Sequence, residues 1–216
     1  MSNPWIAECR NVLAIGRNYV KHIEELNNEI PEVPVVFGKS VSSLTDASAL
    51  MFPRGLAPIH FELEVVLRIG VDIEPGTFRG LDQVSHAGLG IDFTARERQS
   101  QLKAKGLPWQ LAKSFQHAAY LGPLREQPDL TENIAFQLFQ NEALRQHGET
   151  RLMMFDFVTL LGFINRTLPL RAGDLVYTGT PAGVGPVAEG DRLRLTCSQL
   201  NTDCRLTVGF FDTEST

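Results

Sequence analysis

Cysteine is scarce in this sequence: its 216 residues include only Cys9, Cys197 and Cys204, with no Cys-x-x-Cys pair. An odd and sparse set argues against a disulfide framework, and it predicts free thiols in a reducing, cytoplasmic location. The N-terminal stretch "MSNPWIAECR" also lacks a basic segment followed by an apolar run, so we expect no secretory signal there.

Long apolar runs and an excess of basic residues are missing as well. No stretch approaches the roughly 18 apolar residues that are needed to span a bilayer, which argues against a membrane protein. The formal net charge of −5 gives no electrostatic reason to bind nucleic acid or anionic membranes. We therefore expect neither as a partner.

Several well-defined catalytic motifs are absent or incomplete. The stretch "GLGIDF" lacks the third glycine of a dinucleotide fingerprint, and "TGTPAGVG" lacks the Gly-Lys-Ser/Thr ending of a phosphate loop. There is no G-x-S-x-G nucleophile elbow. His60-Phe61-Glu62 resembles the first half of a zinc deaminase signature, but the P-C-x-x-C half is missing. Serine hydrolase, kinase and zinc deaminase functions are accordingly not supported.

What is present is an ordinary globular mixture of strands and helices. Hydrophobic residues make up 43% of the chain and charged residues 21%, which predicts one catalytic domain over residues 1–216. Strands outnumber helices and the helices are unevenly spaced, so we expect the α+β class. The expected strands cover 11–16, 34–40, 60–70 and 86–94, and residues 175–185 are expected to form a strand that runs into a glycine turn. The expected hairpins cover 134–150 and 191–210, and the expected helices cover 18–30 (with Asn18 as a candidate cap), 95–106 and 153–168.

The stretch "IHFELEVVLRIG", residues 59–70, places two carboxylates in an otherwise apolar strand. Alternate residues of a strand share a face, so His60, Glu62 and Glu64 are expected to project together. One interpretation is an edge strand with a solvated acidic face. The other is a bound divalent cation that compensates the two like charges. Carboxylate ligands with few histidines and no cysteine select Mg²⁺ or Mn²⁺ over Zn²⁺.

Three further positions carry candidate chemistry, each beside a plainer interpretation. Asp92 follows the apolar run "AGLGI" and is a candidate third ligand, although its spacing alone favours a helix N-cap. His22 and Glu25 share one face of the expected first helix, either as a general base with its orienting carboxylate or as a surface pair. Lys113 lies in the apolar stretch "GLPWQLAKSF", where it is either partly desolvated or extends its amine to solvent.

Six motifs then occur in order between about Val12 and Asp191: "GRNYVKHIEEL", "PVVFGKS", "IHFELEVVLRIG", "GIDFTARERQ", "KGLPWQLAKSF" and "GDLVYTGTPAGVGPV". This series resembles the fumarylacetoacetate hydrolase family, in its short single-domain form similar to acylpyruvate hydrolases. The resemblance implies the fold of that family's C-terminal domain, a compact α+β arrangement of packed, partly rolled mixed sheets with few helices. It also implies a homodimer.

The resemblance carries site residues over by motif. It implies Glu62, Glu64 and Asp92 as the ligands of Mg²⁺ or Mn²⁺, which overturns the N-cap interpretation of Asp92. It implies His22 and Glu25 as the catalytic dyad of a lid and Lys113 as a buried catalytic lysine. The residues that it implies around the substrate are Arg17, Tyr19, Gln99 and Thr180.

The implied activity is that of a metal-dependent hydrolase that cleaves a carbon–carbon bond in an acylpyruvate and releases pyruvate. Three carboxylates opposite one divalent ion would leave the site anionic, unless the substrate supplies a bidentate, polarisable group and Lys113 adds a positive charge. A 2-keto carboxylate is expected to chelate the ion through its acid and keto oxygens. The same apparatus suits an oxaloacetate decarboxylase or a keto–enol tautomerase or isomerase, which we keep as the alternative. A non-catalytic keto-acid binding protein is less favoured, because binding alone has no use for a base.

Overall fold

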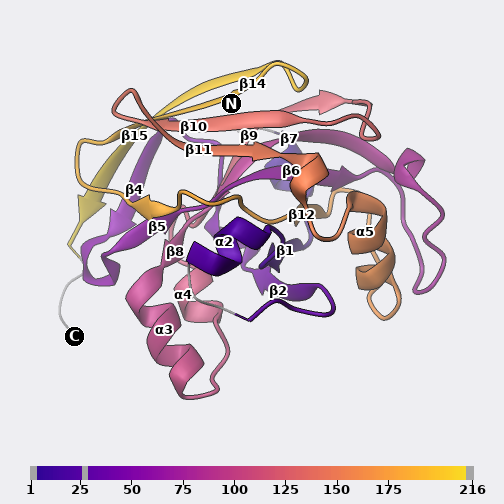
Figure 1. Cartoon of the computed structure of the whole chain (residues 1–216), viewed down its shortest axis with the longest axis horizontal. Coiled ribbons are helices and arrows are strands. Elements are labelled where there is room, and N and C mark those ends of the chain that lie inside the picture. The colour runs from indigo at the N-terminus through magenta and orange to yellow at the C-terminus, as the bar shows by residue number, and fades with distance from the viewer. Residues whose placement is uncertain (1–3, 26–28, 213–216) are drawn as a thin grey trace.

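Strands dominate the computed structural model, which describes residues 4–25 and 29–212 (Figure 1). The largest sheet has the order β2 (Val35–Lys39), β1 (Val12–Gly16), β12 (Leu175–Tyr177), β6 (Leu63–Ile69), β7 (Val84–Asp92), β9 (Ala119–Glu126) and β3 (Leu44–Thr45). The second has the order β11 (Ala143–Glu149), β10 (Ala135–Gln140), β14 (Arg192–Cys197), β15 (Thr202–Phe211) and β4 (Ala49–Pro53). The smallest has the order β13 (Gly185–Pro186), β5 (Ile59–Phe61) and β8 (Thr94–Ala95).

Helices are few and short in the described part of the chain. They are α1 (Pro4–Glu8), α2 (Val20–Glu25), α3 (Arg96–Ala104), α4 (Gln110–Lys113) and α5 (Phe157–Asn165), with 3-10 turns η1 (Val41–Ser43), η2 (Arg54–Leu56), η3 (Leu81–Gln83) and η4 (Thr150–Leu152). None of the helices in these ranges has the length and apolar character needed to cross a membrane. Parallel pairs β1–β12, β3–β9 and β4–β15 join otherwise antiparallel sheets. The expected α+β class with mixed sheets and few helices is confirmed.

The centre of the largest sheet explains the unbroken apolar run at residues 65–67. Every residue of β6 is buried, because β12 and β7 flank it within the sheet and both of its faces are covered. Val65 and Leu67 face the main core, whereas Val66 joins a second cluster with Tyr177 on the opposite side. A strand that is buried on both faces shows no alternation of polar and apolar residues. Because β6 is packed on both sides, it holds the charged groups at its end in fixed positions.

One glycine allows the central strands to approach closely beside that base. A Cβ atom at Gly90 on β7 would lie 2.6 Å from Val66 Cγ2 and 2.7 Å from both the Tyr120 carbonyl oxygen and Tyr177 Cε1. The Tyr177 hydroxyl donates a hydrogen bond of 2.8 Å to the same Tyr120 carbonyl. The residue two places before Asp92 therefore has no room for a side chain.

The structure departs from the sequence-based expectations at two elements. The expected single strand at 60–70 is interrupted at Glu62, since β5 pairs with β8 and β13 whereas β6 pairs with β12 and β7. The first long helix begins at Val20 and is described only to Glu25, and part of its expected range, residues 26–28, lies outside the described residues. Asn18 does not cap that helix, because its side chain is buried and bonded to Phe155 and Thr178.

The two expected hairpins are present. Asn141 and Glu142 both have positive φ, at 51° and 67°, as a tight turn between β10 and β11 requires. Across the second hairpin Cys204 lies opposite Leu195, and Cys197 lies opposite Thr202, so the two thiols do not face each other. All three cysteines are free.

Candidate active site

Three carboxylates meet where the largest and smallest sheets join. Glu62 lies at the junction of β5 and β6, Glu64 lies within β6, and Asp92 ends β7. The backbone amide of Asp92 donates a hydrogen bond of 2.9 Å to the Glu62 carbonyl, which holds the two strand ends together. One ligand atom from each carboxylate lies within 4.8 Å of the others, and all three residues are buried. This cluster of hard oxygen donors fits a divalent cation such as Mg²⁺ or Mn²⁺.

Two buried lysines hold the carboxylates in place. Lys113 Nζ donates hydrogen bonds to Glu62 (2.8 Å), Asp92 (2.6 Å) and the Thr94 hydroxyl (2.6 Å). Its exposed fraction is 2%, so it does not extend to solvent. Lys39, at the end of β2, donates to the other oxygen of Asp92. Burial lowers the pKa of Lys113, but Asp92 and Glu62 outweigh burial and the pKa is raised, which keeps the amine charged.

The charge balance of the cluster therefore differs from the expected one. Arg96, at the start of α3, forms an ion pair with Glu62, so the carboxylates face three cationic side chains and not Lys113 alone. Burial raises the pKa of Glu62, yet Lys113 and Arg96 together bring it well below its ordinary value. Burial and then Asp92 raise the pKa of Glu64 well above its ordinary value, although its carboxylate accepts a hydrogen bond from the Gly179 amide. The structure thus places more basic side chains beside the carboxylates than the sequence had indicated.

The short helix α2 carries the expected dyad over this cluster. The distance from His22 Nδ1 to Glu25 Oε2 is 3.5 Å. His22 is buried, and burial lowers the pKa of its imidazole more than the nearby carboxylates raise it. Both carboxylate oxygens of Glu25 also accept from the Gly183 amide, at 3.2 and 3.1 Å. A buried imidazole that is neutral at pH 7 is suited to accept a proton, which a surface pair would not be.

A cavity of about 120 Å³ opens between α2, α3 and the cluster. Its lining residues are Gly16, Arg17, His22, Phe37, Glu62, Arg96, Gln99, Ser100, Lys103, Trp109 and Lys113. Of the residues named from the sequence, Arg17, His22, Gln99, Glu62 and Lys113 thus share one space.

Tyr19 and Thr180 do not line this cavity. Tyr19 is buried beside Met153, with which it forms an isolated bridge. The Thr180 hydroxyl donates to the Leu63 carbonyl at 2.9 Å and accepts from Gln146 at 2.8 Å, so protein groups already occupy it. The expected contacts of Tyr19 and Thr180 with substrate remain predictions.

Sequence reasoning did not nominate Lys39, Arg96 or Lys103. Lys39 and Arg96 both lie within quoted motifs, "PVVFGKS" and "GIDFTARERQ". A lysine that ends an apolar strand is a usable signal, because a buried amine needs an anionic partner. Lys103 offered no such signal on a polar helix.

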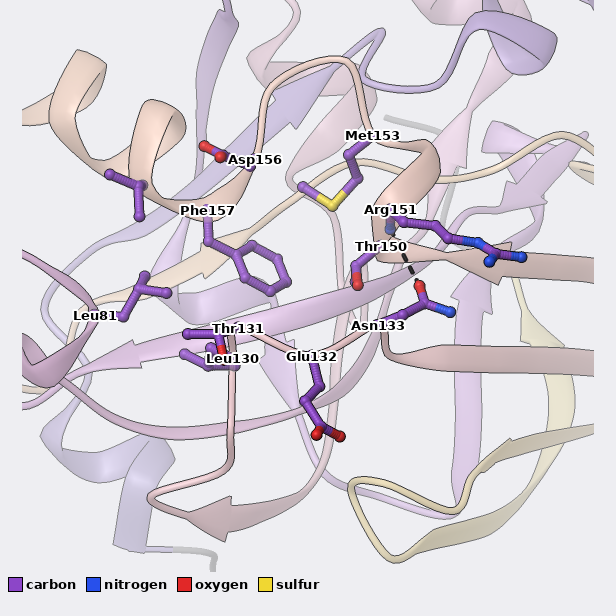
Figure 2. Close-up of a pocket in the computed structure, with 11 residues that line it drawn as sticks. Leu81, Leu130, Thr131, Glu132, Asn133, Thr150, Arg151, Met153, Asp156 and Phe157 are labelled. Atoms are coloured by element: carbon purple, nitrogen blue, oxygen red, sulfur yellow. Dashed lines mark hydrogen bonds between the residues drawn. The ribbon is translucent and has the colours of Figure 1, made fainter.

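A larger hollow of about 350 Å³ lies elsewhere, beside α5 (Figure 2). It is bordered by apolar side chains such as Leu81, Met153 and Phe157. Its Asp156 is engaged as the N-cap of α5, where it accepts from the Thr159 amide at 2.8 Å. None of the residues expected to act in catalysis lines it, so cavity size alone does not locate the site.

The mixed sheets, with three buried carboxylates clustered where two of them join, indicate an enzyme family. Residues 11–208 match the family described as fumarylacetoacetate (FAA) hydrolase C-terminal. The chain belongs to the fumarylacetoacetate hydrolase family, as its ordered motifs had indicated.

Relatives within the family carry different activities in their names. The oxaloacetate tautomerase YcgM of Escherichia coli (strain K12) is 35% identical over 190 residues, covering 86% of this chain and 87% of that protein. The mitochondrial oxaloacetate decarboxylase of Dictyostelium discoideum is 34% identical over 209 residues, covering 92% and 94%. The crystal structure of fumarylpyruvate hydrolase from Pseudomonas aeruginosa, in complex with Mn²⁺ and pyruvate, is 28% identical with a TM-score of 0.88, covering 94% and 91%.

Proposed function

We propose that this protein is a divalent-metal-dependent enzyme that interconverts the keto and enol forms of a small 2-keto acid of the oxaloacetate type. The observation that carries the proposal is a small, cation-rich cavity that contains a buried, neutral imidazole, His22. The names of the curated relatives support the same substrate class.

The size of the cavity favours a short substrate. Ligand pockets commonly measure about 300–1,000 Å³. The cavity beside His22 measures about 120 Å³. A four-carbon acid suits that space better than an acylpyruvate with a long acyl group.

Different side chains around the cavity would take different parts in the reaction. Glu62, Glu64 and Asp92 would hold Mg²⁺ or Mn²⁺, which when bound acts as a Lewis acid on the substrate's keto group. His22 takes a proton from the carbon beside the keto group and returns one in the reverse direction. Lys113 keeps a positive charge at the cavity wall, where it stabilises negative charge developing on the substrate.

The dyad's second member and the helix itself assist that proton transfer. Glu25 orients the His22 imidazole and ties α2 to the Gly183 amide. With α2 in place, the cavity is screened from bulk water, which protects a reactive enolate.

Pyruvate-releasing hydrolysis of an acylpyruvate is the second candidate. A solved relative is a fumarylpyruvate hydrolase with Mn²⁺ and pyruvate bound, and His22 could equally deprotonate an attacking water. The sequence alone favoured this hydrolase. We place tautomerisation first because of the cavity's size and the relatives' names. Decarboxylation of oxaloacetate leaves the buried base without a task, since loss of CO₂ requires no activated water.

One panel of assays separates these activities. The full chain with Mg²⁺ is mixed with enol oxaloacetate, and loss of enol absorbance is followed beside pyruvate and CO₂ release. Acylpyruvates, including fumarylpyruvate, are assayed in parallel. We expect rapid enol loss without matching pyruvate release. Robust pyruvate release from an acylpyruvate, with slow enol conversion, would overturn the proposal in favour of the hydrolase.

We further propose that residues 1–216 form one catalytic domain that works as a cytoplasmic homodimer. Family analogy supports the domain and the dimer, and the scarcity of cysteine supports the compartment. Light scattering at micromolar protein should give the mass of a dimer, and a monomer would refute that part.

A further inference from the structure

A buried glutamine lies against the peptide that joins two of the candidate metal ligands. Gln146 is on β11, at the edge of the second sheet, and is 0% exposed. Its Oε1 atom accepts a hydrogen bond of 2.9 Å from the backbone amide of Leu63, the residue between Glu62 and Glu64. One side chain of the second sheet thus holds the strand of the largest sheet at the point where that strand carries its carboxylates.

The Gln146 side chain belongs to a closed ring of hydrogen bonds around Leu63. Its Nε2 atom donates to the Thr180 hydroxyl at 2.8 Å, and that hydroxyl donates to the Leu63 carbonyl at 2.9 Å. Nε2 also donates to the Pro181 carbonyl at 2.9 Å. A backbone amide can only donate and a carbonyl can only accept, so the partners fix the orientation of the glutamine amide. Side chains therefore hold both backbone polar groups of Leu63.

A β-bulge and a glycine bring Gln146 to this place. The pairing of β11 with β10 skips Arg145, immediately before Gln146. Such a bulge changes the direction of the side chains that follow it. Accordingly Leu144 is exposed, whereas the polar Gln146 is buried. A Cβ atom at Gly183, which has a φ of 96°, would overlap the Arg145 carbonyl, so only glycine lets the segment 180–183 lie this close to β11.

The peptide held by Gln146 sets the spacing of two like charges. β5 ends at Phe61 and β6 begins at Leu63, so Glu62 and Glu64 lie on either side of a break between strands. Regular pairing does not run through that break, and the ring around Leu63 fixes the backbone there instead. The carboxylate of Glu64 is held from the same direction, because it accepts a hydrogen bond of 2.6 Å from the amide of Gly179.

We propose that Gln146 is a positioning residue of the metal site: by fixing the Leu63 peptide it sets the separation of the Glu62 and Glu64 carboxylates, and with it the affinity for a divalent cation. Gln146 touches neither the ion nor the substrate. The inference rests on the proposed function, because that proposal makes Glu62 and Glu64 metal ligands. Hydrogen-bonding groups that orient metal ligands typically contribute about 10–100-fold to metal affinity.

The test compares Gln146→Met with Gln140→Met. Gln140, on the neighbouring β10, is also buried, and its Nε2 donates to the Pro186 carbonyl at 3.0 Å and to the Asp191 carboxylate at 2.6 Å. Each substitution keeps the length of the side chain and removes a buried amide that donates to a proline carbonyl. The full chain is titrated with Mn²⁺ without substrate, and free and bound Mn²⁺ are measured by electron paramagnetic resonance. Urea denaturation is followed in parallel.

Both variants should unfold at lower urea concentration than wild type, because each leaves buried polar groups without a donor. Gln146→Met alone should weaken Mn²⁺ binding, by about 10–100-fold, and alone should change the spectrum of bound Mn²⁺. Gln140→Met should bind Mn²⁺ within about twofold of wild type. Wild-type affinity in Gln146→Met would overturn the proposal, and so would equal losses in the two variants, which would reflect general destabilisation.

Thr180→Val breaks the same ring at its other side chain and serves if Gln146→Met fails to fold. It should also weaken Mn²⁺ binding, because the Leu63 carbonyl loses its donor. If the two side chains act through one ring, the loss in the double variant should be smaller than the product of the single losses. Losses that multiply, or normal Mn²⁺ affinity in Thr180→Val, would contradict the ring.

The titration separates this inference from the proposed function, because Mn²⁺ binding requires no turnover. Weakened binding in Gln146→Met would support the inference even if wild type fails to interconvert keto and enol forms. Active wild type with unchanged Mn²⁺ affinity in Gln146→Met would refute the inference and leave the proposed function standing. Absence of Mn²⁺ binding by wild type would overturn both.

Discussion

The floor and the lid of the cavity are built in opposite ways. On the floor, Glu64, Asp92 and Lys113 are 1–2% exposed and extend from the central sheet and its border. In the lid, the described part of α2 has six residues and the Glu25 side chain is 34% exposed. A helix of that length is not stable by itself in water, so its position depends on contacts with the rest of the protein, which bury His22 and Ile23 and engage Glu25. The candidate metal ligands thus lie on the strands of the sheets, whereas the candidate base lies on a short helix outside them.

The lid's attachments can be named individually. The buried Asn18 side chain donates to the Phe155 and Thr178 carbonyls and accepts from the Phe155 amide. At the other end, Glu25 accepts from the Gly183 amide. The difference between floor and lid predicts that floor variants abolish chemistry, whereas lid variants reduce it in steps.

The largest effect is expected from Asp92→Asn on the floor. The variant removes a carboxylate that Lys39 and Lys113 both contact, and with it a candidate metal ligand. Loss of Lewis-acid stabilisation of several kcal/mol should lower kcat/KM by about a thousandfold or more. Calorimetric Mg²⁺ titration should show weakened binding. Asp82→Asn, at an exposed position in η3, should behave as wild type. Unchanged Mg²⁺ affinity in Asp92→Asn would remove the metal assignment.

His22→Ala should have the next largest effect. Loss of general-base help should cost roughly 10²–10⁴-fold in kcat, while oxalate binding stays intact because oxalate needs no base. If kcat of His22→Ala remains within a few-fold of wild type, His22 is not the general base, and α2 only covers the cavity.

The pH profile sharpens the same assignment. The base must be neutral, so the rate falls as pH drops through the pKa of His22. Because burial lowers that pKa from its ordinary value of about 6.5, the wild-type rate should hold to below pH 6.5. This fall should be absent from His22→Ala. A fall centred well above pH 6.5 would contradict a buried, neutral imidazole.

Asn18→Ala tests the anchor of the lid. The variant leaves the Phe155 amide without its partner and removes two donated hydrogen bonds. We expect urea denaturation to show a loss of about 2–3 kcal/mol in the free energy of unfolding. A loss below about 0.5 kcal/mol would show that this anchor is dispensable.

Glu25→Gln should have the smallest effect. The amide oxygen can still accept from Gly183, but it no longer balances an imidazolium that forms during proton transfer. We expect kcat to fall by less than about tenfold, with Glu32→Gln, at an exposed position, as the control. A fall as large as that of His22→Ala would assign Glu25 a direct part in proton transfer.

The sequence predicted the floor of the cavity more completely than the lid. The run Val65–Leu67 predicted a strand buried on both faces, because two-sided burial removes alternation. The break at Glu62 was not predictable, since strand partners from distant segments create it. The expected helix begins at Asn18, two residues before the described one, because periodicity carries no information about tertiary contacts such as those of the Asn18 side chain. Lys39 was missed because its partner, Asp92, is remote in sequence.

The glycine at position 90 has a consequence for anyone who transplants this site into another scaffold. Copying the three carboxylates alone would not reproduce their spacing, because a methyl group at position 90 would press against both flanking strands and against Tyr177. The recipient sheet would also need a glycine two residues before the aspartate. A transplanted site would therefore need the glycine at position 90 as well as the three carboxylates.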